Sequence, residues 1–176
     1  RMRSLIEETA AHAPGRRATL ALLALILLIA AGTRLWQLGE QSVWYDEFNS
    51  IRYLDAPTVR AFLDEQQEYN DEMVPLYFVL QYYWARALGD APANLRLLSI
   101  LFGLAALAVL YCVGNGLFGP VGAFISTMCM ALSPFMIYLD QGLRPYSLVV
   151  LLGLISGASL LRMLREAAVP AIDILS

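Results

Sequence analysis

The chain has 176 residues, of which 59% are hydrophobic and 15% charged, and its mean hydropathy is +0.58. Hydropathy this high exceeds what a water-soluble domain tolerates, so we expect an integral membrane protein. The 12 basic residues are all arginine and the formal net charge is −3; the lack of lysine excludes Schiff-base chemistry, and the lack of a basic patch gives no support to nucleic-acid binding.

The first predicted element is a transmembrane helix at 18–38, an almost wholly apolar run long enough to cross a bilayer. No small-residue cleavage site follows a short apolar core, which disfavours a removed signal peptide. The preceding segment, 1–17, carries four arginines and is expected to stay cytoplasmic, so the residues after the helix should lie on the outer face. Arg34, near the outer end of this helix, is expected to reach the headgroups or to anchor the helix there.

A first outer loop is predicted at 39–95, and it opens with Trp44-Tyr45-Asp46-Glu47. An acid pair where a helix leaves the bilayer is close enough to lipid to act on a lipid-borne substrate. It is also wet enough to remain charged. We therefore predict an active site at the membrane surface, with solvated surface acids as the alternative.

The rest of this loop is predicted to form helices that lie along the membrane. Asp55 is expected to cap a short amphipathic helix that Pro57 begins. The apolar core of 75–88 is too short to span comfortably, and it is rich in tyrosine and tryptophan, which prefer the interface. We interpret it as an interfacial or shallow re-entrant helix.

Three further spans are predicted at 96–117, 120–139 and 147–164. With four spans in total, Arg162 and Arg165 return to the cytoplasm, as the positive-inside rule requires; counting 75–88 as a fifth would place them outside. The second outer loop, 140–146, then lies on the same face as the acid pair. The cytoplasmic end, 165–176, begins another apolar stretch without completing it, which indicates a truncated chain.

The second outer loop holds the other candidate site residues. Arginine on the outer face needs a partner, and the planar guanidinium of Arg144 suits a phosphate; a salt bridge to Asp46, Glu47 or Asp140 is the alternative. Tyr138 and Tyr146 could stack on a sugar ring or belong to the interfacial aromatic belt.

Several short motifs along the chain occur in an order that carries a family resemblance. In chain order these are Arg34-Leu35-Trp36, Asp46-Glu47, Pro75-Leu76-Tyr77, Tyr83-Trp84, Leu88-Gly89, Arg96, Ser133-Pro134, Gln141, Arg144 and Tyr146. Together they resemble the membrane-embedded glycosyltransferases of the GT-C fold, in the branch of the protein O-mannosyltransferases and the bacterial aminoarabinose transferase for lipid A. The resemblance covers roughly residues 19–165 and implies an all-α membrane protein, namely the N-terminal transmembrane helices of a GT-C bundle.

The resemblance implies an inverting transferase that takes a sugar from a polyprenyl-phosphate donor and passes it to a hydroxyl of a glycan, lipid or protein acceptor. It implies a multi-pass protein of the bacterial inner membrane with an outward-facing site. Asp46 is then the expected catalytic base, with Glu47 as its neighbour in the acid pair, and Arg144 is the expected phosphate ligand. The other residues expected to bind substrate are Tyr146, Gln141, Asp140, Trp44 and Arg34.

The sequence departs from the family pattern in two places. Related proteins often have a histidine where this chain has Met73-Val74, and often an acid where it has Gly142. No ligand spacing identifies a metal, so a divalent cation is left open, with Asp71 and Glu72 as its candidate ligands. Two other classes stay open: a non-catalytic scaffold or lipid-linked-sugar-binding relative and, with less support because the predicted spans carry few polar residues, a transporter.

Overall fold

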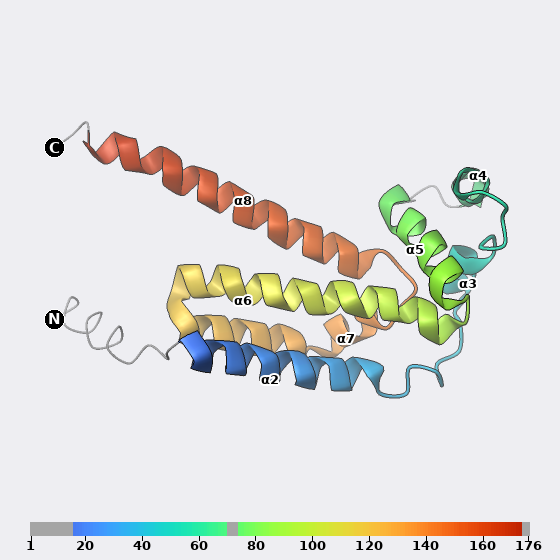
Figure 1. Ribbon diagram of the computed structural model, residues 1–176, viewed down its shortest axis with the longest axis horizontal. Helices are drawn as coiled ribbons and strands as arrows, with labels where there is room; N and C mark the ends of the chain where they lie inside the picture. The colour runs from blue at the N-terminus through green and yellow to red at the C-terminus, as the bar shows by residue number, and fades with distance from the viewer. Residues whose placement is uncertain (1–15, 70–73, 174–176) are drawn as a thin grey trace.

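The computed structural model describes residues 16–69 and 74–173, and every regular element within these ranges is a helix. Figure 1 shows their arrangement. The helices are α2 (Arg16–Leu35), α3 (Tyr45–Ile51), α4 (Val59–Tyr69), α5 (Pro75–Leu88), α6 (Pro92–Ala131), α7 (Pro134–Asp140) and α8 (Tyr146–Asp173). Those long and apolar enough to cross a membrane lie at Arg17–Leu35, Pro92–Ala131 and Tyr146–Ala167. The predicted all-α membrane fold is confirmed.

Helix α6 reverses direction at Gly119, so it forms two antiparallel arms (Figure 1). Side chains of both arms pack against α2. Gly119 has φ 73° and ψ 179°, a conformation that is essentially restricted to glycine. Pro120 then begins the second arm, where a missing N–H costs nothing. The arms pack closely, because a Cβ on Gly114 would lie 3.1 Å from the Ala123 Cα.

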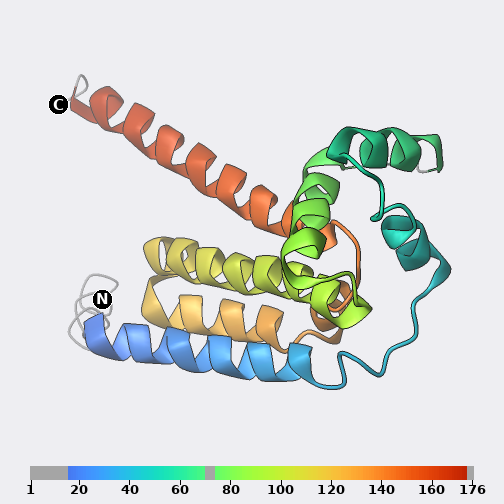
Figure 2. The ribbon, with the colours of Figure 1, turned by 45° about the vertical axis from the view of Figure 1, so that its right-hand side comes forward.

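The predicted third and fourth spans differ from the observed helices. The segment 120–139 is not one helix: α6 ends at Ala131, and α7 begins after Ser133, whose Oγ accepts a hydrogen bond from the Met136 amide at 3.5 Å. Pro134 opens α7 because it cannot donate to the preceding turn. Helix α8 extends beyond the predicted 147–164 to Asp173, and it diverges from the other long helices toward that end (Figures 1 and 2).

The three helices of the segment predicted as the first outer loop, residues 39–95, gather at one end of the long helices (Figure 2). Their core is aromatic: the Phe62 ring centroid lies 5.6 Å from that of Tyr82 and 6.3 Å from that of Phe78, and all three side chains are buried. Helix α5 coincides with the helix predicted at 75–88. Its buried aromatic side chains pack against α4 and hold the two helices together.

The predicted cap of α4 is wrong. Thr58, rather than Asp55, caps this helix, since its Oγ1 accepts a hydrogen bond from the Ala61 amide at 3.2 Å and its carbonyl accepts one from Phe62 at 3.0 Å. The chain cannot turn into the helix earlier because Ala56 is buried and its carbonyl accepts a hydrogen bond from the Tyr82 hydroxyl at 3.1 Å.

Candidate active site

The acid pair lies at the start of α3, a short helix that the sequence did not predict. Trp44 precedes the helix with extended backbone (φ −78°, ψ 162°), and its amide donates to Glu47 Oε2 at 3.3 Å. Successive residues of a helix point about 100° apart. Asp46 is therefore exposed, whereas Glu47 is only 7% exposed. The two carboxylates thus have different surroundings.

Glu47 connects the two outer loops to α6. Its Oε2 accepts a hydrogen bond from Arg96 Nη2 at 2.9 Å, and its Oε1 accepts one from the Leu143 amide at 2.9 Å. The same Arg96 guanidinium, which is 1% exposed, donates to the carbonyls of Leu38 and Gln41 at 3.0 and 3.1 Å. Because both carboxylate oxygens accept hydrogen bonds from the protein, Glu47 positions the site, and the structure does not support the catalytic role predicted for it.

Arg34 and Asp140 form a second buried ion pair, with Arg34 Nε 2.6 Å from Asp140 Oδ2. Arg34 has no exposed surface and also donates to the Ala131 carbonyl at 3.0 Å, while Asp140 accepts from the Ser147 hydroxyl at 2.6 Å. Arg34 therefore does not reach out to headgroups, and neither Arg34 nor Asp140 lines the cavity beside α3. Their predicted contact with substrate stays a prediction. Each of the two buried charges is stabilised by the other, and the pair connects α2 to α7.

The Asp140 carboxylate is packed closely by neighbouring residues. Burial raises the pKa of Asp140 above its usual range, while hydrogen bonds from Ser147 and Arg34 act in the opposite direction. A Cβ on Gly103 of α6 would overlap this carboxylate, so glycine is required where the two approach.

A cavity of about 420 Å³ opens beside α3, between the two loops that were predicted to lie on the same face. That volume is within the usual range of small-ligand sites. The predicted residues that line it are Trp44, Asp46, Glu47, Gln141, Arg144 and Tyr146. The lining also includes Gln41, Phe135, Tyr138, Leu139 and Gly142. Two polar loops that lie about one hundred residues apart in the chain thus share one site.

Arg144 contributes the basic group of this cavity. Its Nη1 donates to the Asp46 backbone carbonyl over 3.5 Å, and its guanidinium carbon lies 6.0 Å from the Tyr146 ring centroid. Across 16–69 and 74–173, no carboxylate forms an ion pair with this guanidinium, so the salt bridge considered as the alternative is not observed. The remaining donors of Arg144 can therefore bind an anion.

Gln141 lines the cavity but is held by the protein. Its amide nitrogen donates to the Arg34 carbonyl at 2.9 Å and to the Trp36 carbonyl at 3.3 Å, and its Oε1 accepts from Gln41 at 2.9 Å. Gln141 thus attaches the second outer loop to the end of α2. Its side-chain amide is therefore already hydrogen-bonded within the protein at both its nitrogen and its oxygen.

Two aromatic residues of α7 extend the cavity wall. Phe135 and Tyr138 are each 64% exposed and lie three positions apart, so they share one helix face. Tyr138 was already expected to stack on a sugar ring or to belong to the interfacial belt, whereas Phe135 could be recognised only once α7 was known to be a separate helix. Exposed aromatic faces can stack on the apolar face of a sugar ring.

The candidate metal ligands Asp71 and Glu72 lie outside the described residues. Among the residues that are described, no group of three or more histidine, cysteine, aspartate or glutamate side chains could hold a metal ion.

Comparison with protein-family models, with curated proteins and with solved structures yields no match for this chain. Its chemistry must therefore be argued from the geometry of the cavity itself.

Proposed function

We propose that this chain is an integral membrane glycosyltransferase that moves a sugar from a polyprenyl-phosphate donor to an acceptor hydroxyl. The proposal rests on one observation: the exposed Asp46 side chain and the Arg144 guanidinium, with which none of the described carboxylates pairs, line one cavity. This cavity lies at the end of helices that are long and apolar enough to cross a membrane. A base and a phosphate ligand at such a position suit a substrate whose lipid tail stays in the bilayer.

The proposed reaction is a single displacement at the anomeric carbon. The Asp46 carboxylate takes the proton of the acceptor hydroxyl as its oxygen attacks, the new glycosidic bond forms, and the bond from the anomeric carbon to the phosphate oxygen breaks. Both electrons of that bond leave with the lipid phosphate, whose charge Arg144 stabilises. Attack on the face opposite the phosphate inverts the anomeric centre.

The aromatic lining supports a sugar-containing substrate. Trp44 and Tyr138 are 68% and 64% exposed, and both line the cavity that holds Asp46. Ring stacking of this kind recognises the C–H face of a sugar and leaves its hydroxyls free for polar contacts. The acceptor is a hydroxyl of a glycan, a lipid or a protein.

We place the protein in the bacterial inner membrane, as a multi-pass protein with the cavity facing outward. The proposal is supported by the arginine-rich segment 1–17 together with Arg162 and Arg165, which would lie on the cytoplasmic side under the positive-inside rule. A lipid-linked donor follows from this orientation, because nucleotide sugars are not supplied outside the cytoplasm.

One observation favours a second candidate function, a non-catalytic protein that binds lipid-linked sugars. Since Arg96 and Leu143 occupy the oxygens of Glu47, the acid pair contributes one free carboxylate to the cavity. A site with Asp46 alone could bind a donor without transferring its sugar. The two functions differ in one measurable property, the consumption of donor.

The test is transfer of labelled sugar from a panel of polyprenyl-phosphate donors by membranes that contain the chain. Asp46→Asn is compared with Asp64→Asn, the same substitution at an exposed position of α4. We expect transfer by the unmodified chain and by Asp64→Asn, and at least about a 100-fold lower rate for Asp46→Asn, as for loss of a general base.

Each other outcome would contradict part or all of the proposal. Donor that binds without being consumed would establish the binding protein instead. Equal transfer by the Asp46 and Asp64 variants would remove Asp46 from the proposed role. Neither binding nor consumption of any donor by the folded chain would overturn both functions.

A further inference from the structure

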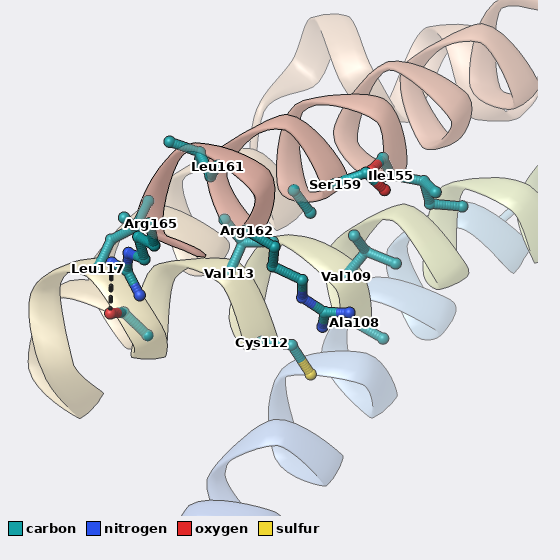
Figure 3. A pocket seen from close by; sticks show the side chains of 12 residues that line it. Ala108, Val109, Cys112, Val113, Leu117, Ile155, Ser159, Leu161, Arg162 and Arg165 are labelled. Carbon is teal, nitrogen blue, oxygen red and sulfur yellow. Dashed lines mark hydrogen bonds between the residues drawn. The ribbon is translucent and has the colours of Figure 1, made fainter. Parts of the chain in front are cut away.

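A second cavity, of about 470 Å³, lies between the first arm of α6 and α8 (Figure 3). It opens where α8 diverges from α6, near the Gly119 reversal and the beginning of α2, and so at the opposite end of the long helices from the candidate active site (Figure 1). Its walls are mainly apolar, with Val109 and Val113 on one side and Ile155 and Ala158 on the other. We call this cavity the α6–α8 groove.

Two arginines of α8 line the groove. Arg165 Nη2 donates to the Gly116 carbonyl at 3.1 Å, and the Arg162 side chain extends from α8 toward Ala108 and Cys112 of α6 (Figure 3). In the part of the chain that the structure describes, no carboxylate lies within ion-pair distance of either guanidinium. A charge beside apolar helices is stabilised by an anion, and none of the described side chains supplies one here.

We propose that the α6–α8 groove binds an anionic glycerophospholipid, with its phosphate on Arg162 and Arg165 and an acyl chain along the apolar walls. The guanidinium fork of arginine matches phosphate oxygens, and basic pockets between membrane helices bind anionic headgroups. Arg165 contacts Gly116, three residues before the reversal, which places the charge near the end of the apolar segment, at headgroup depth. A free phosphate would leave the apolar walls uncovered.

The test is native mass spectrometry of the chain released from micelles that contain equimolar phosphatidylglycerol and phosphatidylcholine. Arg162→Gln is compared with Arg60→Gln, which removes the same charge from an exposed position of α4. We expect the unmodified chain and Arg60→Gln to retain phosphatidylglycerol preferentially. Arg162→Gln should lower this preference by about fivefold, the contribution of one basic residue near an anionic headgroup.

A second variant tests the acyl-chain wall without changing the charge. Ala158→Phe fills the groove from α8 while both arginines remain, so it should lower retention of phosphatidylglycerol as well. Circular dichroism and thermal unfolding establish that this variant is folded. None of these substitutions lies in the candidate active site, so lipid retention and sugar transfer are independent results.

Several outcomes would overturn the proposal. Arg162→Gln could retain as much phosphatidylglycerol as Arg60→Gln, or the unmodified chain could retain both lipids equally. Inorganic phosphate could displace the lipid completely, which would indicate an anion site without an acyl chain. Protection of Cys112 from N-ethylmaleimide in detergent free of phospholipid would indicate that polypeptide covers the groove, since Cys112 lines it and is exposed.

Discussion

Arg96 Nη2 lies 2.9 Å from Glu47 Oε2, and this ion pair is almost completely buried. Removing one partner of a buried pair leaves the other charge without compensation, which typically costs about 3–5 kcal/mol. We therefore expect Arg96→Met to lower the free energy of unfolding by about that amount, as measured by denaturant titration in detergent. Arg60→Met, at an exposed position of α4, serves as the control and should leave the midpoint unchanged. Equal midpoints for the two variants would contradict the structural role of this pair.

The pair of Arg34 and Asp140 can be tested by a double-mutant cycle. Asp140→Leu alone should destabilise the protein by about 3–5 kcal/mol, because it leaves the Arg34 charge buried. Arg34→Met combined with Asp140→Leu should be less destabilised than the sum of the two single variants. The cycle is measured by denaturant titration. Additive effects would mean that the two side chains do not interact as the 2.6 Å distance indicates.

Arg144 should affect transfer far more than stability. Its hydrogen bond within the protein is a 3.5 Å contact to a backbone carbonyl, so Arg144→Gln should leave the unfolding midpoint nearly unchanged. If this guanidinium stabilises the departing phosphate, kcat for sugar transfer should fall by about 100- to 1,000-fold. Steady-state kinetics with a fixed donor measure this, with Arg60→Gln as the charge-matched control. A rise in KM at constant kcat would instead indicate a role in donor binding alone.

Gly119 should not tolerate a side chain. Gly119→Ala places a Cβ at φ 73° and ψ 179°, where a strain of about 1–3 kcal/mol is expected for other residues. Gly116→Ala is a matched control, since it lies in the same region of α6 with open space around its Cα. Thermal unfolding of the two variants gives the comparison. A Gly119 variant as stable as the Gly116 variant would show that the reversal does not depend on this backbone conformation.

Tyr77 predicts a pH dependence of stability. Burial raises the pKa of Tyr77 from 10.0 to about 12, against a hydrogen bond with Ser99. Because the folded pKa is the higher one, the contribution of Tyr77 is fully present below pH 10 and is lost as the pH rises to about 12. The expected loss is about 2–3 kcal/mol for a shift of this size. In denaturant titrations from pH 9 to 12, Tyr77→Phe should remove this part of the decline, and an unchanged profile would contradict the assignment.

The sequence predicted the features that hydropathy and local residue preferences determine. The helix over 75–88 has the predicted bounds, because Pro75 starts it and Gly89, with φ 93°, ends it. The meeting of the two outer loops followed from the number of apolar segments between them. The break at Ser133-Pro134 was visible as a motif, yet it was included in a span because hydropathy averages over a short interruption.

Which residue of the acid pair is buried and which is exposed depends on the tertiary structure, and the local sequence pattern does not reveal it. Nothing in the types of Asp46 and Glu47 says which one is buried; that follows from α3, whose first residue is preceded by Trp44 rather than by a usual capping residue. Likewise, Arg34 resembles an interfacial anchor until Asp140, 106 residues later, is placed against it.

The same separation has a consequence for synthesis. Arg34 reaches the membrane with α2, but its partner is made 106 residues later, which at about 5–20 residues per second is a delay of roughly 5–20 s. The pair of Glu47 and Arg96 is complete after only 49 residues. The nascent chain must therefore hold an unpaired arginine while the next 106 residues are made, shielded by the insertion machinery or by lipid headgroups.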